Sequence, residues 1–570
     1  MKLDWIKEDQ KLFLERGYLD EGETIEQRYK TICKTIEKIC LEQSQNKESI
    51  KYCKGISKRF QKYIESNWVS FATPVLKNFG KKDNHLLPIS CNFSILDDSL
   101  SSIYSHLSET ALLTKAGAGV AVNFSNLRPE GSDISTGGKS NSIMDWIELY
   151  AKSMNSVNQN SSRRGQLTAY LSIDHPQIYE FLTIATLEMP KELMRFFNTI
   201  TTAVTIPEGW RSDLKTNRKK KKLLSKVAEV RNEKGFPYIL DLTNCNRYKH
   251  QCYKDKGMDL VTSNICCEAV EFCDEEKTFA CCLSSVNLYW YDDWKDHPNF
   301  IKDMSIMLDC VIEEYIQKGK NVPEIRRAIK FAEEHRATGL GTLAFHSYLQ
   351  KKSIAFGSMQ SYAINKEIYS KLDSETLKAS RWMARYWGEP KILKGYGERA
   401  TSRTAIAPTK STSAIMGGET MCFSEGIQPI TSNNTEYKLA KNQMTYRNND
   451  LKQLLELKGQ NTKKVWNSIK KNNGSVSHLD FLSDHEKNVF KTFLELSQYD
   501  VVKLAAQRQK FICMGQSLNV AIHPDTPMKE VIKLHITALN DGCKGLYYQY
   551  NMNASQKFSQ DMLTCSACEG

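Results

Sequence analysis

The chain has 570 residues, of which 41% are hydrophobic and 25% charged, a balance typical of a globular protein and not of a disordered or fibrous one. No window approaches about eighteen consecutive apolar residues, and the start of the chain is charged, so the sequence predicts neither a membrane-spanning nor an exported protein. The formal net charge is +12, and the basic run at 218–222 supplies five of these charges. We expect that run to be a solvated surface and not a specific nucleic-acid site.

Residues 1–90 are predicted to be mainly helical. Thr24 and Gln27 form a T-x-x-Q capping signature at the start of one helix. The apolar residues that follow at helical spacing are Ile25, Tyr29, Ile32, Cys33, Ile36, Ile39 and Cys40. Because Cys33 and Cys40 lie on this stripe, we expect both to be small buried hydrophobic residues.

Between residues 71 and 123, short apolar runs alternate with prolines and small residues, which predicts strands and tight loops. A polar region rich in Ser and Gly follows over residues 131–165. It contains T-G-G-K-S at 136–140 but lacks the spacing of a phosphate-binding P-loop, so that motif is excluded.

Residues 365–387 and 485–510 are predicted helices. Near the end of the chain, Thr526 and Pro527 start a helix that stops at Gly542, and residues 546–550 are a predicted strand. Strand-like and helical segments alternate through the middle of the chain, which predicts an α/β architecture.

Seventeen cysteines are too few for a disulfide scaffold in a chain of this size, and their number is odd, so we expect thiols in a reducing compartment. The most informative segment is S-N-I-C-C-E-A at 263–269. In an extended strand or a finger-like loop, Asn264, Cys266 and Glu268 would face the same side. An amide, a thiol and a carboxylate would then combine hydrogen bonding, sulfur chemistry and proton transfer. The alternative is a buried strand with an incidental polar edge.

Four other cysteines stand outside helical stripes. Cys91 and Cys281 lie in strand-like settings and could form a transient disulfide if their Cα atoms come within about 7 Å. Cys565 and Cys568 form a C-x-x-C pair next to the C-terminus. A zinc site needs four ligands, and no second C-x-x-C or H-x-x-x-H accompanies this pair, so a mobile dithiol that exchanges with a disulfide is favoured over zinc.

Nine short motifs occur in one order along the chain. They are A-T-P at 72–74, S-C at 90–91, D-S-L at 98–100, R-R-G at 163–165, N-x-C-x-E at 264–268, C-x-L-x-S-x-N-L at 281–288, P-T-x-S-T-S at 408–413, L-Y-Y at 546–548 and C-x-x-C at 565–568. In this order, and over about residues 10–570, they resemble the large, catalytic subunit of class I ribonucleoside-diphosphate reductase. One motif would be weak, whereas nine in order are specific.

The resemblance implies a radical mechanism. Cys266 matches the transient thiyl radical that removes the 3′-hydrogen of the ribose, Glu268 matches the base that takes the 3′-hydroxyl proton, and Asn264 matches the amide that holds the sugar hydroxyls. Cys91 and Cys281 match the dithiol that supplies two electrons and helps to expel the 2′-hydroxyl as water, ending as a disulfide.

Two further pairs gain roles in the same way. Cys565 and Cys568 match the tail pair that reduces this disulfide by exchange. Tyr547 and Tyr548 match the relay that carries an oxidising equivalent from a partner subunit to Cys266. On the residues alone, two neighbouring tyrosines would be packing residues.

The resemblance also implies two binding sites. The positions that match the substrate site are Thr73, Ser90, Cys91, Gly119, Asn264, Ile265, Cys266, Cys267, Glu268, Pro408, Thr409, Lys410, Ser411 and Thr412. In the last five, backbone amides and hydroxyls at a predicted helix start can cradle a diphosphate. The positions that match a site for nucleoside triphosphate effectors near a dimer interface are Asp98, Ser99, Leu100, Arg128, Arg163 and Arg164.

The implied fold is α/β, with a ten-stranded α/β barrel of two half-barrels around a central finger loop. The implied domains are a helical N-terminal region (1–70), the catalytic barrel (71–555) and a flexible redox-active tail (556–570). The chain would form a homodimer, bind no metal itself and take its radical from a dinuclear-metal small subunit. A thioredoxin- or glutaredoxin-like protein would be the reductant and ribonucleoside diphosphates the substrates. We expect a cytoplasmic location, in a bacterium or in the host of a virus.

Several positions depart from the family pattern. Cys267 and Cys282 each add a thiol beside a functional cysteine and are expected to face away from it. Ser135 stands where some relatives have a phosphate-binding Arg, and Lys410 stands where some have an acidic residue. About ninety residues precede Cys91, fewer than an ATP-binding cone requires, so we expect no cone and no switch of overall activity by dATP through it.

Two alternatives follow from the same motifs. The adenosylcobalamin-dependent class shares the barrel, Cys266 and Glu268, but it has no need of the Tyr547 and Tyr548 relay. The glycyl-radical class is disfavoured, because Gly570 lacks the surrounding motif. A thiol-rich protein that binds zinc or nucleic acid, with the barrel as a scaffold, is the alternative from a different class.

Overall fold

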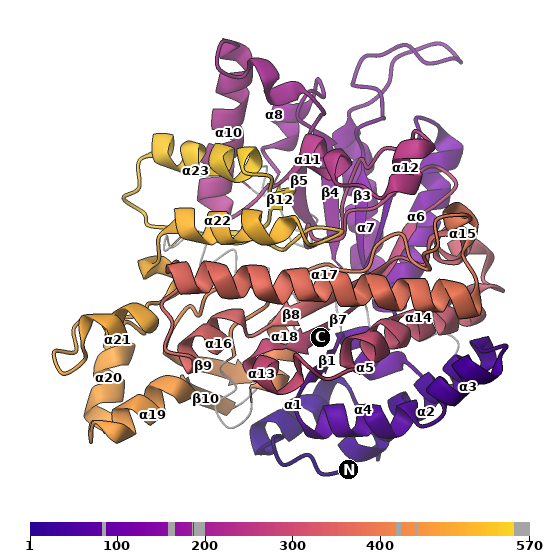
Figure 1. Cartoon of the computed structure of the whole chain (residues 1–570). Coiled ribbons are helices and arrows are strands. Elements are labelled where there is room, and N and C mark those ends of the chain that lie inside the picture. Colours follow the sequence, from indigo (N-terminus) through magenta and orange to yellow (C-terminus); the bar gives the residue numbers. More distant parts are fainter. Residues whose placement is uncertain are drawn as a thin grey trace.

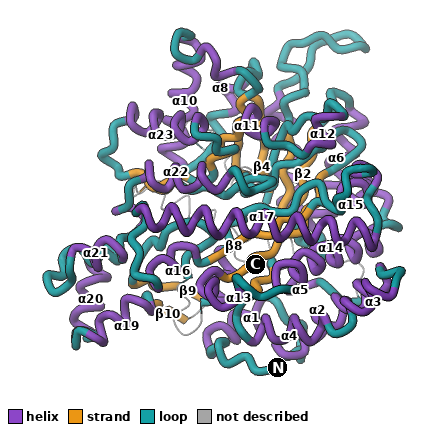
Figure 2. The backbone as a smooth tube through the Cα atoms, viewed as in Figure 1, coloured by secondary structure: helices purple, strands orange, loops and turns teal. Residues whose placement is uncertain are grey.

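The computed structural model describes residues 1–82, 87–89, 91–157, 166–184, 186, 200–417, 423–439 and 442–551. Strands lie at the centre of the molecule and helices lie around them (Figure 2). Within this part of the chain, no helix is both long and apolar enough to cross a membrane.

Four helices form the N-terminal region at one end of the molecule (Figure 1): α1 (Glu8–Gly17), α2 (Ile25–Gln43), α3 (Lys47–Cys53) and α4 (Ile56–Glu65). The predicted capping box of α2 is present, and its whole apolar stripe is buried. The prediction for Cys40 is wrong in one respect: this buried residue is not a free thiol but forms a disulfide with Cys53. Helix α3 brings Cys53 back to the end of α2, which the pattern of a single helix does not reveal.

The first half of the barrel is a run of parallel strands in chain order. They are β2 (Cys91–Ile95), β3 (Gly119–Asn123), β4 (Leu167–Ser172), β5 (Ile200–Ile206) and β6 (Tyr238–Asp241). The helices of the connections are α6 (Leu100–Lys115), α7 (Ile143–Val157), α8 (Ile178–Phe181) and α10 (Arg218–Lys234). Four of the five basic side chains at 218–222 are exposed on α10, as predicted for a solvated run.

Helix α6 corrects the prediction of strands and loops throughout 71–123. Its N-cap is Ser99, whose hydroxyl accepts from the backbone N–H of Ser102. Its buried face carries His106, Glu109 and Thr110 beside apolar residues. A helix that buries polar groups shows no clear apolar stripe in the sequence.

The second half begins with β7 (Phe279–Asn287), which pairs antiparallel with β2 and parallel with β8 (Thr338–Leu343). Parallel bridges then join Leu340 to Thr404 and Ile406 to Gln516. The backbone N–H of Tyr547 donates to the Leu518 carbonyl at 2.9 Å, and the preceding strand β12 (Gly545–Leu546) pairs with β6.

These hydrogen bonds close a ring. The ring has ten extended segments: the eight strands β2 to β8 and β12, and the two bridge-linked segments at 404–406 and 514–518. The predicted α/β barrel of two half-barrels is therefore confirmed. Strand β1 (Val69–Phe71) pairs with β7 as an extra strand outside the ring.

The remaining elements pack around this ring or extend it. The helices are α5 (Thr73–Asn78), α11 (Leu242–Arg247), α12 (Gln251–Asp255), α13 (Tyr291–Trp294), α14 (Phe300–Gly319), α15 (Arg326–His335), α16 (Phe345–Lys351), α17 (Met359–Trp387), α18 (Lys410–Met416), α19 (Asn449–Leu457), α20 (Lys463–Lys471), α21 (Asp484–Val489), α22 (Gln498–Gln509) and α23 (Met528–Asn540). The strands are β9 (Asn434–Leu439), β10 (Asn442–Arg447), β11 (Val520–Ile522) and β13 (Gln549–Asn551).

The four elements predicted in the C-terminal part of the chain are present with changed bounds. The helix predicted at 365–387 lies within α17, and the one that begins after Pro527 is α23. The helix predicted at 485–510 is divided into α21 and α22. The predicted strand at 546–550 is interrupted at Tyr547 and Tyr548, which lie between β12 and β13.

Alternating side chains separate two cores. Along β4, Leu167, Ala169 and Leu171 belong to the outer core between the barrel and its helices, whereas Tyr170 belongs to a second buried cluster. That cluster holds Cys91, Phe93, Cys266, Cys281, Ala121, Tyr238 and Tyr547. It is the barrel interior, because successive side chains of a strand point to opposite faces of a closed sheet. Four residues that the motifs singled out, Cys91, Cys266, Cys281 and Tyr547, lie in it.

Candidate active site

The segment at 263–269 is a finger-like loop and not a strand. Its tip turns at Cys267, whose φ is 63°. The Asn264 side chain holds the loop: its Oδ1 accepts from the backbone N–H groups of Glu268 and Ala269, both at 3.1 Å, and its Nδ2 donates to Glu268 Oε1 at 2.9 Å. Asn264 and Glu268 therefore converge as predicted, through a turn instead of strand alternation.

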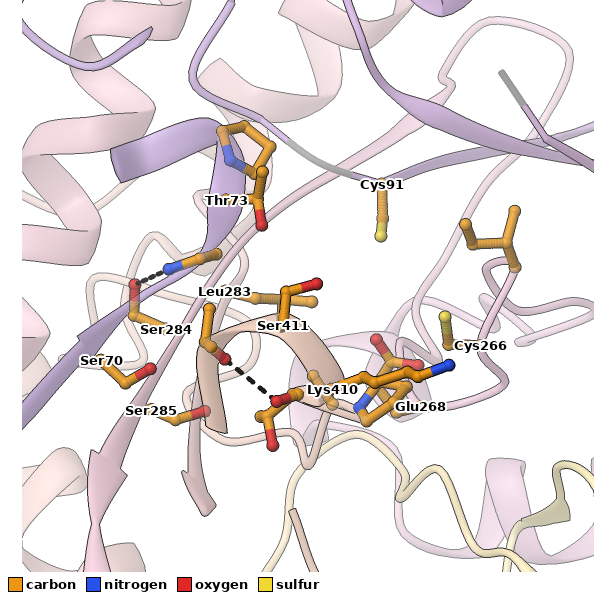
Figure 3. A pocket seen from close by; sticks show the side chains of 17 residues that line it. Ser70, Thr73, Cys91, Cys266, Glu268, Leu283, Ser284, Ser285, Lys410 and Ser411 are labelled. Atoms are coloured by element: carbon orange, nitrogen blue, oxygen red, sulfur yellow. Dashed lines mark hydrogen bonds between the residues drawn. The ribbon is translucent and has the colours of Figure 1, made fainter. Parts of the chain in front are cut away.

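A cavity opens between the finger loop, strands β2 and β7, and the start of α18 (Figure 3). The predicted site residues that line it are Thr73, Cys91, Ile265, Cys266, Glu268, Pro408, Thr409, Lys410, Ser411 and Thr412. The sulfur atoms of Cys91 and Cys266 point into the same space from opposite walls (Figure 3). The cavity thus combines two thiols, a carboxylate and a row of hydroxyls.

Charge in the cavity wall is confined to two side chains of the described residues. Glu268 carries the carboxylate and Lys410 the ammonium group, and Lys410 extends toward the end of the cavity where Cys266 and Glu268 lie (Figure 3). Thr409, just before α18, has a left-handed backbone with φ 56°, and its hydroxyl accepts from the backbone N–H of Gly426 at 2.7 Å. This bond joins the 408–412 segment to the loop that contains Gly426.

Strand register brings the second pair of thiols together. Cys91 on β2 lies opposite Cys281 on β7, and the rings of Phe93 and Phe279, two residues along, stack at 4.1 Å. Both cysteines are buried, and burial raises the pKa of the Cys281 thiol well above its ordinary value. Cys282 packs in the outer core, so this extra thiol faces away as predicted.

The predicted tyrosine pair reaches the finger loop. The Tyr547 hydroxyl donates to Cys266 Sγ at 3.6 Å. The rings of Tyr547 and Tyr548 lie 4.5 Å apart, and Tyr548 is half-buried. A continuous path of aromatic rings therefore runs from the edge of the barrel to the Cys266 thiol.

Three predicted substrate-site residues take other positions in the structure. The Cys267 thiol donates to the Ile239 carbonyl at 3.8 Å, and burial raises its pKa to about 12. Gly119 is part of β3, where an added Cβ would lie 2.3 Å from Cδ1 of Ile265. Cys267, Gly119 and Asn264 are not among the residues that line the cavity within the described part of the chain. Gly119 instead makes room for the finger loop.

Two of the predicted effector residues form an ion pair away from this cavity. Arg128 Nε donates to Asp98 Oδ2 at 2.7 Å, and both side chains are about one-third exposed, at 37% and 33%. Ser99 caps α6, and Leu100 is exposed. Ser90, Arg163, Arg164, Cys565 and Cys568 lie outside the described residues.

Several residues of the site were not predicted. Ser70, Ser284 and Ser285 add hydroxyls to the cavity wall. Ser517 and Tyr238 contact the catalytic candidates: Ser517 Oγ lies 3.0 Å from Glu268 Oε2, and the Tyr238 ring lies 4.7 Å from that of Tyr547. The serines of β1 and β7 could have been inferred from strand pairing with the cysteine motif. Ser517 and Tyr238 carry no such local signal.

Metal coordination is not part of the described site. Among the residues that the structure describes, no group of three or more His, Cys, Asp or Glu side chains is placed to hold a metal ion. Sulfur, carboxylate and phenol groups are thus the reactive groups at hand.

Comparisons with known proteins agree with this geometry. The model of the ribonucleotide reductase barrel domain matches residues 89–219, 210–392 and 390–549. The Actinobacillus ureae class Id ribonucleotide reductase alpha subunit is similar in structure, with a TM-score of 0.87 and 37% identity over 99% of this chain and 100% of that one.

Curated relatives point the same way. The ribonucleoside-diphosphate reductase large subunit of Invertebrate iridescent virus 3 is 29% identical over 86% of this chain and 87% of its own length. The large chain from Schizosaccharomyces pombe is 26% identical over 88% of this chain and 70% of its own length. The resemblance drawn from the nine motifs is confirmed, and the chain belongs to the ribonucleotide reductase barrel-domain family.

Proposed function

We propose that this chain is the catalytic subunit of a ribonucleoside-diphosphate reductase, which reduces ribonucleoside diphosphates to 2′-deoxyribonucleoside diphosphates through a thiyl radical at Cys266. The observation that carries the proposal is the meeting of Cys266, Glu268 and Cys91 in one cavity, with the Tyr547 hydroxyl 3.6 Å from the Cys266 sulfur. Removal of the 2′-hydroxyl is difficult from an intact ribose, and a radical at the adjacent carbon makes its loss feasible.

The cavity supports a specific substrate pose. The diphosphate would lie against the hydroxyls of Thr409, Ser411 and Thr412, and Lys410 would turn to it from the Cys266 end of the cavity, because a cation and several donors suit its charge. The ribose would then lie between Cys266 and Cys91. Burial in the barrel excludes water from the radical intermediate.

The chemical steps balance within these residues. The Cys266 thiyl radical takes the 3′-hydrogen atom and becomes a thiol, while Glu268 accepts the 3′-hydroxyl proton. The 2′-hydroxyl leaves as water with a proton from one thiol of the Cys91 and Cys281 pair, and the hydrogen atom of the other thiol goes to C2′. The remaining electron of the pair and the proton held by Glu268 then reduce the 3′-ketone, so that the two thiols end as a disulfide. Cys266 finally returns its hydrogen atom to C3′ and becomes a thiyl radical again.

Two outside agents complete the cycle. A dinuclear-metal small subunit is proposed to supply the oxidising equivalent, which would pass through Tyr548 and Tyr547 to Cys266. Cys565 and Cys568, in the proposed tail (556–570), are proposed to reduce the disulfide and to be reduced in turn by a thioredoxin- or glutaredoxin-like protein.

We propose an effector site and a dimer interface at the segment that follows β2 and at helices α6 and α7. Asp98, Ser99, Leu100 and Arg128, with Arg163 and Arg164, would bind a nucleoside triphosphate effector. Exposed apolar side chains support a homodimer at the same place: Leu100 and Tyr104 on α6 are 64% and 55% exposed, and Trp146 on α7 packs edge-on against Tyr104. The proposed domains are 1–70, 71–555 and the tail, and the proposed location is the cytoplasm.

The test is reduction of labelled CDP by the purified full chain with dithiothreitol. Deoxycytidine diphosphate should form when a candidate small subunit is added, and Cys266→Ala should abolish it under any reductant. Product with adenosylcobalamin and no small subunit would overturn the class I assignment. Bound zinc with no dependence of activity on Cys266 would favour a zinc-binding scaffold protein instead.

A further inference from the structure

Ser517 lies directly beneath the finger loop. It belongs to the bridge-linked segment at 514–518 of the barrel, and its backbone N–H donates to the Ile406 carbonyl at 2.9 Å. Its buried hydroxyl lies within hydrogen-bond distance of two acceptors on the loop, the Cys266 carbonyl at 2.8 Å and Glu268 Oε2 at 3.0 Å. A serine hydroxyl has one hydrogen and accepts through its lone pairs, so it donates to one of these acceptors at a time.

The second carboxylate oxygen of Glu268 has a partner of a different kind. Asn264 Nδ2 donates to Oε1, and the orientation of this amide is set because Asn264 Oδ1 already accepts from two backbone N–H groups. An amide nitrogen is a donor and does not accept. Asn264 therefore suits the carboxylate, whereas Ser517 can also serve the protonated acid.

We propose that Ser517 is a positioning residue for Glu268, which it holds in both of its protonation states by rotating its hydroxyl between Glu268 and the Cys266 carbonyl. This inference rests on the proposed function, in which Glu268 takes a proton from the substrate. While Glu268 is a carboxylate, the Ser517 hydroxyl donates to Oε2. Once the substrate proton is bound at Oε2, Glu268 donates to Ser517 Oγ, and the Ser517 hydroxyl turns to the Cys266 carbonyl. One O–H bond breaks in the substrate and one forms on Glu268, while the O–H bond of Ser517 stays intact.

The same hydroxyl ties the base to the radical residue. Ser517 contacts the main chain of Cys266 and the side chain of Glu268, and the Gly515 backbone N–H donates to the Glu268 carbonyl at 2.6 Å. One segment of the barrel wall therefore fixes the positions of both Cys266 and Glu268. Loss of the hydroxyl would leave the main chain in place and remove the hydrogen bond to Glu268 Oε2.

The titratable groups near Glu268 decide how the pH profile of activity can be interpreted. From the finger loop these are Cys266 and Cys267, from β2 and β7 Cys91 and Cys281, from β4 Tyr170, and from the start of α18 Lys410. Glu271 lies further along the loop, and burial raises the pKa of its carboxyl. Burial also raises the pKa of Cys267, Cys281 and Tyr170, so these groups are neutral near pH 7. A change of the acidic limb in a Ser517 variant would therefore be assigned to Glu268 through contact, because Ser517 touches the Glu268 carboxylate.

The experiment compares Ser517→Ala with the unchanged protein in the complete enzyme, with small subunit and CDP. We expect kcat to fall about 10-fold or more, KM to change little, and the acidic limb of the kcat profile to move up by about one pH unit, because a lost donor disfavours the carboxylate. Ser517→Thr, which keeps the hydroxyl, should restore the limb. If Ser517→Ala does not fold, Ser517→Cys provides a weak donor for the same comparison.

The matched control is Ser263→Ala. Ser263 is buried at the base of the same loop. Its hydroxyl lies 2.8 Å from the Ala269 carbonyl and 3.4 Å from Asn264 Oδ1, so its contacts are with the loop and not with the Glu268 carboxylate. This variant should leave the acidic limb in place whatever it does to stability. An unchanged limb in Ser517→Ala, or equal shifts in the Ser263 variant, would overturn the role of Ser517. Turnover by Cys266→Ala would instead overturn the proposed function, so the two failures are distinguishable.

Discussion

Cys91 lies directly opposite Cys281 in the antiparallel pairing of β2 and β7. Directly opposed residues of antiparallel strands have Cα atoms about 4.5–5.5 Å apart, which is within the range that a disulfide spans. The pair can therefore pass between dithiol and disulfide while the strands stay in register, held by the stacked rings of Phe93 and Phe279.

We predict that turnover without an external reductant joins Cys91 to Cys281. Peptide mapping under non-reducing conditions should find this bridge after CDP is added, and Cys91→Ser or Cys281→Ser should abolish both the bridge and the product. Cys282→Ser should retain both, since Cys282 packs outside the barrel. A bridge from Cys91 to Cys282 would contradict the register.

The Tyr547 hydroxyl should be required for turnover but not for folding. In Tyr547→Phe the ring still packs at 4.5 Å from Tyr548 and 4.7 Å from Tyr238, so the melting temperature should change little. Turnover with the small subunit should fall by about 10³-fold or more, as expected when one member of a unit is lost. Tyr550→Phe is the control, because its ring lies beyond Tyr548 at 6.4 Å. Normal turnover in Tyr547→Phe would rule out the relay.

Lys410→Met should weaken substrate binding. Lys410 carries the positive charge among the described residues of the cavity wall. A charge-assisted contact to a phosphate is worth about 1–3 kcal/mol, so KM for CDP should rise about 10-fold with kcat nearly unchanged. Lys221→Met, on the exposed start of α10, is the control. A fall in kcat at constant KM would mean that Lys410 acts on the chemistry and not on the diphosphate.

The disulfide between Cys40 and Cys53 should stabilise the N-terminal helices. It closes a loop with a sequence separation of 13 residues, and cross-linking a loop of that size contributes about 3 kcal/mol. Thermal unfolding should shift to lower temperature when dithiothreitol is added, and the variant with both cysteines changed to Ala should not respond. Cys33→Ala keeps the bridge and should respond like the unchanged protein. A melting curve that is insensitive to reductant would show that the bridge contributes nothing.

Stability should fall as the pH rises through the range set by Asp450. Burial raises the pKa of this carboxyl to about 6, although it accepts a hydrogen bond from the Tyr289 hydroxyl at 2.9 Å. The folded chain holds this proton more tightly than the unfolded chain, so the cost is absent below about pH 4 and complete above about pH 6. Asp450→Asn should raise the free energy of unfolding at pH 7 by up to about 3 kcal/mol and change it little at pH 4. Asp480→Asn, at an exposed position, should show no such difference.

The features that were predicted from the sequence depend on neighbouring residues in the chain or on recognisable motifs. The capping box of Thr24 and Gln27 depends on neighbours in the chain, and the convergence of Asn264 with Glu268 depends on one short loop. The barrel followed from the order of motifs, since no periodicity marks a closed ring of strands. The register of β2 and β7 places Cys91 opposite Cys281, as expected for a pair that can form a disulfide.

The parts that escaped prediction depend on contacts between distant segments. Ser517 meets Glu268 across a separation of 249 residues, and nothing near it in the chain marks it. Cys53 meets Cys40 because α3 folds back on α2. Helix α6 buries polar side chains such as His106, so its pattern does not resemble an amphipathic helix. Each of these is decided by tertiary packing.

The short strand β12 seals the barrel by pairing with β6, and Tyr547 follows it immediately along the chain. The strand that closes the barrel is therefore followed directly by the tyrosine whose hydroxyl contacts Cys266. In the proposed mechanism, a barrel that has not closed would have no relay from Tyr547 to Cys266. Formation of the Cys266 radical would then require that the barrel which shields it is complete.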